Sequence, residues 1–157
     1  MPNEQIKQKM PVGMIIILII IGYGLVSVLF AFTRISPLFQ LGPVLISGMG
    51  AIIADIIIVA ILATIFIGIL KRFMWARKLA VGYYILSMIL VLIDLLSFMT
   101  NTTMYDSYYQ KVLSPQMLAL MTPAVIEGSL IAGLIFGWVI GLVIIIYLLK
   151  KKNFFVN

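Results

Sequence analysis

The sequence contains no cysteine and no histidine among its 157 residues. These absences exclude disulfides, metal sites built from thiolates or imidazoles, histidine-ligated haem and histidine acid–base catalysis. Charged residues are also scarce: they make up 10% of the chain, and only 5 of them are acidic. The chain therefore has few groups that bind metals or catalyse reactions, and we expect neither a metal nor a cofactor.

Hydrophobic residues are abundant and make up 64% of the chain, whereas soluble domains contain about 45–50%. Runs of roughly 18 or more apolar residues are typical of membrane helices, and four such runs take up most of the sequence. We predict an all-α fold, a four-helix transmembrane bundle, formed by a single membrane domain, residues 1–157. The predicted helices span about 11–32, 43–70, 79–99 and 123–149.

An outer loop is predicted over residues 100–122. Within it, Ser114 and Pro115 suit the cap and the first position of a helix, and residues 114–121 either form a short interfacial helix or remain an ordinary loop.

The basic residues give a net charge of +6, which in a soluble protein would favour nucleic-acid binding. Here they cluster at the ends of the apolar runs, where they determine topology, so we expect the lipid bilayer as partner and no nucleic acid. If the N-terminus is cytoplasmic, the outer segments hold only Arg34 and Lys111. The inner segments then hold the other nine of the 11 basic residues: Lys7, Lys9, Lys71, Arg72, Arg77, Lys78, Lys150, Lys151 and Lys152. We therefore predict a multi-pass protein of the cell membrane with both termini in the cytoplasm.

A basic segment, residues 71–78, separates the second apolar run from the third. Lysine and arginine suit the cytoplasmic headgroup layer, and a tryptophan beside them suits the membrane interface. The predicted cytoplasmic anchor consists of Lys71, Arg72, Trp75, Arg77 and Lys78. The alternative is a docking surface for a cytosolic partner.

Two lone aspartates, Asp55 and Asp94, interrupt the apolar runs on either side of the basic segment. Each lies sixteen residues from the nearest lysine (71 − 55 and 94 − 78), which corresponds to about 24 Å of helix. Tyr83 and Ser87 fall on the same helical face as Asp94, and such a polar face should point away from lipid. These four residues form a candidate proton or cation site; alternatively, each protonated acid only hydrogen-bonds a neighbouring helix.

The same aspartates suggest a membrane aspartyl protease. Leu92-Ile93-Asp94-Leu95 and Ala54-Asp55 resemble fragments of the lipoprotein signal peptidase motifs. The order of the fragments is reversed here, and the neighbouring asparagines are missing. We therefore expect a protein that is not an enzyme and has no catalytic residue.

A further acidic residue, Glu127, lies 23 residues before Lys150 (150 − 127), about 34 Å along a helix. This places it near the outer boundary of the membrane, at the level expected for Arg34. We predict an outer salt bridge between Arg34 and Glu127; an outward-facing binding site is the alternative.

Small residues recur every four positions in the last apolar run, at Ser129, Gly133, Gly137 and Gly141. Small residues at this spacing, a glycine zipper, let another helix backbone approach closely. The partner is a helix of the same chain or of a second subunit. This pattern favours a homo-oligomer or an accessory subunit of another membrane protein.

Short stretches in three parts of the chain together resemble those of a loose group of small prokaryotic, often archaeal, four-helix integral membrane proteins of unknown function. They are Lys9-Met10-Pro11-Val12-Gly13, then Gly68-Ile69-Leu70-Lys71 with Trp75-Ala76-Arg77-Lys78, and Tyr147-Leu148-Leu149-Lys150 with Phe154-Phe155. In this chain Met10 stands where the group usually has an arginine. The resemblance implies a four-helix architecture and no activity.

Overall fold

The computed structural model describes residues 10–32, 38–41, 44–100 and 122–155. In chain order its elements are α1 (Val12–Ala31), β1 (Leu38–Leu41), β2 (Val44–Ser47), α2 (Met49–Leu70), α3 (Met74–Thr100), α6 (Pro123–Lys150) and a short 3-10 helix (Lys152–Phe154). All four α-helices are long and apolar enough to cross a membrane. The prediction of four helices long and apolar enough to span a membrane is therefore confirmed.

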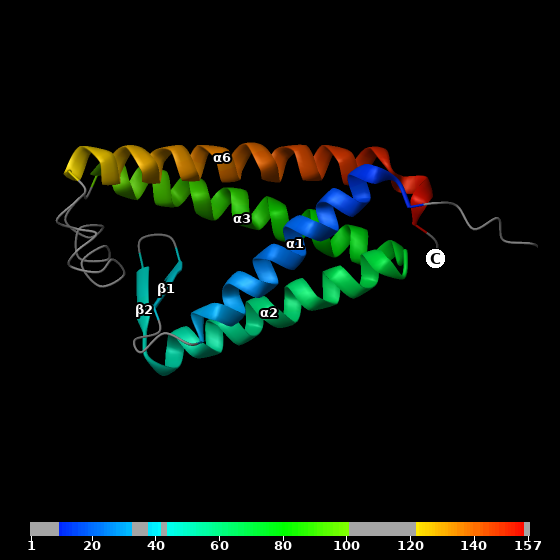
Figure 1. Cartoon of the computed structure of the whole chain (residues 1–157), viewed down its shortest axis with the longest axis horizontal. Helices are drawn as coiled ribbons and strands as arrows, with labels where there is room; N and C mark the ends of the chain where they lie inside the picture. Colours follow the sequence, from blue (N-terminus) through cyan, green and yellow to red (C-terminus); the bar gives the residue numbers. More distant parts are fainter. Residues whose placement is uncertain (1–9, 33–37, 42–43, 101–121, 156–157) are drawn as a thin grey trace, which may run out of the picture.

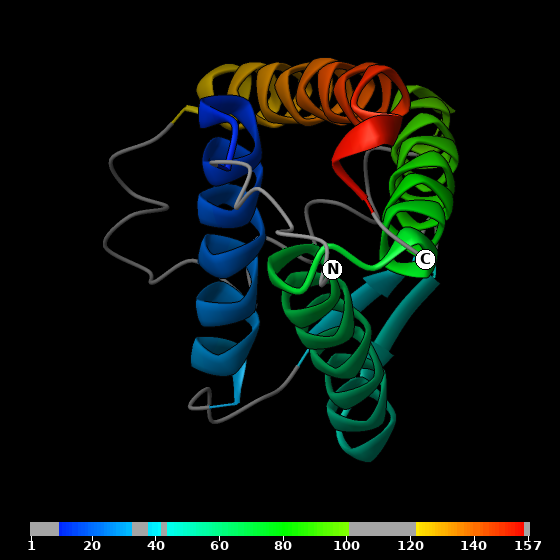
Figure 2. The same cartoon turned by 90° about the vertical axis from the view of Figure 1, so that its right-hand side faces the viewer.

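The helices form two pairs, α1 with α2 and α3 with α6 (Figure 1). The pairs meet where α2 turns into α3, which we call the hinge end, and diverge toward the opposite end, the open end. In both views the start of α2 lies low in the picture and the end of α3 lies high (Figures 1 and 2). The hinge end also holds the start of α1 and the end of α6.

The hydrophobic core lies toward the hinge end and takes residues from all four helices. Its buried members are Met14, Ile17, Leu18, Ile21, Leu62, Ile65, Ile69, Ala76, Ala80, Ile144, Leu148, Phe154 and Phe155. Lipid tails are as apolar as these side chains, so close packing, not removal from water, holds helices together in a bilayer. Stability is therefore concentrated at the end where the four helices touch.

Two glycines of α1 lie beside large side chains of α2. A Cβ atom at Gly22 would lie 3.7 Å from Phe66, and one at Gly24 would lie 3.7 Å from Leu62. These are ordinary van der Waals distances. The large side chains of α2 therefore occupy the space beside these glycines without strain.

The turn from α2 to α3 is shorter than predicted, because only Lys71–Phe73 separates the helices. The amide of Phe73 donates to the carbonyl of Gly68 (2.9 Å) and that of Arg72 to Ile69 (3.0 Å), the two bonds of a Schellman motif. This motif reverses the chain within three residues. Helix α3 therefore begins at Met74, not at 79 as predicted.

The prediction that the second helix begins at residue 43 is wrong. Residues 44–47 form a strand that pairs antiparallel with β1, with Leu38 opposite Ser47 and Leu41 opposite Val44. The ladder pairs the facing backbone groups of the two strands with each other. Gly48 then adopts a positive φ of 65°, which glycine tolerates, and α2 begins at Met49.

Candidate functional site

A cavity of about 240 Å³ lies between the four helices, where the two pairs begin to diverge. Its walls are mostly aliphatic, but four of its side chains carry a polar atom: Tyr83, Tyr84 and Ser87 of α3, and Trp138 of α6. The remaining lining residues are Ile20, Ile21, Gly24, Leu62, Met88, Val91, Gly137 and Gly141. The cavity is thus an apolar space with hydroxyl groups and an indole in its wall.

Two residues of the polar face of α3, Tyr83 and Ser87, line this cavity. Tyr83 and Ser87 are half-buried and lie within side-chain hydrogen-bonding reach of each other. The ring of Tyr84 meets that of Tyr83 edge to face, with centroids 5.5 Å apart. These two members of the predicted proton or cation site therefore share one cavity, and they face other helices as the pattern predicts.

The two aspartates occupy different surroundings from Tyr83 and Ser87. Asp55 is only 6% exposed and Asp94 is half-buried, and each takes part in a hydrogen bond or an electrostatic interaction. Neither lines the cavity among the described residues, and α2 and α3 diverge away from the hinge end (Figure 1). Within the same part of the chain, no three acidic residues are grouped to hold a metal ion.

Trp138 is a cavity residue that the sequence patterns did not single out. Its Nε1 atom is buried and has no hydrogen-bond partner within the described chain. Its position along the helix is a signal in the sequence that could have identified it. Trp138 lies 12 residues before Lys150 (150 − 138), about 18 Å from that end of the helix, whereas membrane tryptophans concentrate at the interfaces.

The glycine zipper of α6 divides into two parts. Gly141 is buried, and a Cβ atom there would lie 3.2 Å from Cγ of Met88 on α3. Gly133 and Gly137 are exposed, and a Cβ atom at either would meet nothing within 4 Å. Gly137 lines the cavity. The first part of the zipper is thus not covered by the described chain, and Ser129 at its start is exposed as well.

The residues of the predicted cytoplasmic anchor gather at the hinge end. Trp75 is 48% exposed and stacks on Phe73, with ring centroids 5.8 Å apart. The guanidinium of Arg72 lies 4.8 Å from the ring centre of Phe154, a cation–π geometry. Lys71 and Lys78 are exposed, and Arg77 is half-buried. Because α3 begins at Met74, three of these five residues belong to its first two turns.

Several predictions concern residues outside the described part of the chain. Arg34 is one of them, so the outer salt bridge between Arg34 and Glu127 stays a prediction. Glu127 itself is exposed near the start of α6. The predicted outer loop also lies outside the described residues apart from its ends, so whether residues 114–121 form an interfacial helix or an ordinary loop stays open. Lys7, Lys9 and Lys111, on which the topology argument partly depends, lie outside the described residues too.

Comparison with known proteins identifies no relative. No protein-family model matches the sequence, and neither a curated protein nor a solved structure is significantly similar to it.

Proposed function

We propose that this chain is a non-enzymatic subunit of the cell membrane, with both termini in the cytoplasm, that functions by associating with another membrane helix. The basic residues that lie at the ends of the described helices support this orientation. Lys71, Lys78 and Lys150 to Lys152 lie at the hinge end, and cytoplasmic segments carry an excess of lysine and arginine. The partner is either a second copy of the chain or a different membrane protein.

The open space beside Gly133 carries this proposal. At this position no side chain of the described residues covers the backbone of α6, so another helix can approach it closely. Close approach strengthens dispersion contacts and weak hydrogen bonds, which drive association in lipid. Gly141 illustrates the effect within the chain, since Met88 packs against it.

The test is the mass of the purified full chain in nanodiscs and in mild detergent as a function of concentration. We expect a dimer or a larger oligomer, which Gly133→Leu weakens by about tenfold in dissociation constant, a change of about 1.4 kcal/mol. Gly133 is the better position to change because, unlike Gly137, it does not line the cavity.

The matched control is Gly82→Leu on α3, another exposed glycine whose Cβ would meet nothing within 4 Å. It adds the same side chain outside the zipper and should leave association unchanged. A chain that is monomeric at every concentration and captures no partner from its native membrane contradicts the proposal. So does an oligomer that tolerates Gly133→Leu as well as it tolerates Gly82→Leu.

A second function, proton or cation transport, is favoured by the burial of Asp55 inside a spanning helix. Carboxyl groups in membrane helices are costly and usually functional. We expect proteoliposomes to show a proton or cation flux that Asp55→Asn or Asp94→Asn abolishes, while helical content is unchanged. Glu127→Gln, at an exposed acid, is the control. Equal flux in both asparagine variants would eliminate the transport role.

A further inference from the structure

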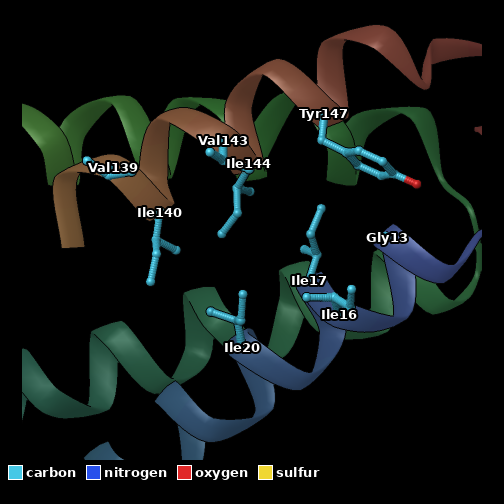
Figure 3. A pocket seen from close by; sticks show the side chains of 9 residues that line it. All are labelled: Gly13, Ile16, Ile17, Ile20, Val139, Ile140, Val143, Ile144 and Tyr147. Carbon is cyan, nitrogen blue, oxygen red and sulfur yellow. The ribbon is translucent and has the colours of Figure 1, made fainter. Parts of the chain in front are cut away.

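A second hollow, which we call the seam, lies between α1 and α6, the first and last helices. It has a volume of about 240 Å³ and is lined by aliphatic side chains, Gly13 and Tyr147. Val139 and Ile20 lie at one end and Tyr147 at the other (Figure 3). Ile16 and Val143 are 51% and 60% exposed, so the seam opens on the outer surface of the bundle.

The size of the seam corresponds to lipid chains in one leaflet. From Val139 to Tyr147 it follows eight residues of α6, about 12 Å. One leaflet contributes about half of the hydrocarbon core, which is about 30 Å thick. The seam thus offers an aliphatic surface over most of the depth that one acyl chain occupies.

The hinge end of the seam carries a hydroxyl group and positive charge. The hydroxyl oxygen of Tyr147 lies beside Gly13, in the first turn of α1 (Figure 3). Lys150 and Lys151 follow Tyr147 by three and four residues, which places them on the same helical face. The amide of Lys151 donates to the carbonyl of Tyr147 (3.0 Å), so this spacing is helical. Both lysines are exposed.

We propose that the seam binds one anionic phospholipid of the surrounding bilayer. One acyl chain lies against the aliphatic wall between α1 and α6. The phosphate lies at the hinge end, where the Tyr147 hydroxyl donates a hydrogen bond to it and Lys150 and Lys151 supply the compensating charge. A neutral lipid can fill the same apolar space but gains nothing from the two lysines. The site is therefore selective for the charge of the headgroup.

Native mass spectrometry of the full chain tests this proposal. The protein is titrated with equal amounts of phosphatidylglycerol and phosphatidylcholine that carry identical acyl chains. We expect one phosphatidylglycerol to be retained in preference to phosphatidylcholine. The double variant Lys150→Gln with Lys151→Gln should reduce that preference by about 10- to 30-fold, the combined contribution of two basic residues at an anionic surface. The matched control, Lys71→Gln with Lys78→Gln, removes equal charge from the same end.

A second pair of variants tests the acyl-chain contact. Val143→Phe fills the seam and should lower the retention of both lipids several-fold, whereas Val125→Phe changes an exposed valine of α6 outside it. Circular dichroism verifies that each variant keeps its helices. Equal retention of the two lipids by the unaltered chain overturns the proposal, as does an equal effect of the two lysine pairs. A second copy of the chain released by Val143→Phe, without any change in bound lipid, also overturns it.

Discussion

Gly13 of α1 and Tyr147 of α6 are in direct contact at the hinge end. A Cβ atom at residue 13 would lie 2.5 Å from Cζ of the tyrosine, a distance that no side chain tolerates without movement. Only glycine therefore lets the tyrosine ring lie against the first turn of α1. The contact joins the first helix of the chain to the last.

Replacing Gly13 by alanine should destabilise the protein by about 1–2 kcal/mol, because the Tyr147 ring must leave its position. Chemical unfolding in detergent micelles, followed by circular dichroism, measures the change. In a Tyr147→Ala background, Gly13→Ala should lose most of this destabilising effect, because the ring that it displaces is absent. Gly22→Ala is the control, since its Cβ would lie 3.7 Å from Phe66. Additive effects of Gly13→Ala and Tyr147→Ala would show that the contact contributes nothing.

Replacing Gly68 by alanine should cost more, about 3 kcal/mol. Its Cβ would clash with Cβ of Ala76 and lie 3.0 Å from Cη2 of Trp75. The Cβ of Ala76 is fixed by the backbone of α3, so the turn itself must open. Gly82→Ala, in open space on α3, should be neutral or slightly stabilising. Equal stability of the two alanine variants, by the same unfolding measurement, would contradict this account of the turn.

Arg72 should show two opposing contributions to stability. Its φ of 61° costs about 1 kcal/mol for a residue with a side chain, whereas its guanidinium gains about 0.5–1 kcal/mol over the ring of Phe154. Arg72→Gly should therefore change the free energy of unfolding little in the unaltered chain. In a Phe154→Leu background, the same change should stabilise the protein by about 1 kcal/mol. An identical effect in both backgrounds would exclude the coupling between Arg72 and Phe154.

Trp138→Phe should be neutral or stabilising by about 1 kcal/mol, although it removes part of a large side chain. A buried donor without a partner carries a desolvation penalty of about 1–3 kcal/mol, and phenylalanine has no such donor. Trp75→Phe is the control at an exposed tryptophan. A loss of more than about 2 kcal/mol for Trp138→Phe alone would indicate that the indole N–H binds a partner from outside the described chain.

The helices were predictable because each is a long apolar run, and most of their ends lie next to a charge or a proline. Both ends of α1 and of α6 lie within one residue of the predicted bounds. The start of α2 was not predictable in the same way. Pro43 suits the first turn of a helix, but a Gly-Pro pair between short apolar runs also suits a hairpin turn. Hydrophobic content does not distinguish a helix from a hairpin at this point, since strand and helix are equally apolar here.

The cavity and the seam could not be predicted from periodicity. Helices such as α1, α2 and α6 are apolar around most of their circumference, so their sequences do not indicate which face meets a neighbour. Helix α3 carries a polar stripe, of which Tyr83 and Ser87 line the cavity and Asp94 does not. The pairing of α3 with α6, and the divergence of the two pairs, depend on the shapes of particular side chains such as Met88 beside Gly141.

The segments on which the predicted resemblance to small prokaryotic membrane proteins depends contribute residues that touch one another at the hinge end, and the resemblance itself stays a prediction. Gly13 meets Tyr147, Gly68 meets Trp75 and Ala76, and Phe154 and Phe155 are buried in the core. A shared pattern at these positions has a packing explanation that does not require a shared activity. In this chain the residues of these segments therefore contribute to the packing of the hinge end.

The divergence of the two helix pairs means that the protein has a different cross-section at different depths of the bilayer. In a bilayer that the four helices span, lipids of one leaflet would surround the compact hinge end, and those of the other leaflet would surround the wider, open end. We expect lateral pressure in that second leaflet to act on the angle between the helix pairs, with the three-residue turn as its pivot. Bilayer thickness and chain saturation are the variables that would alter this angle.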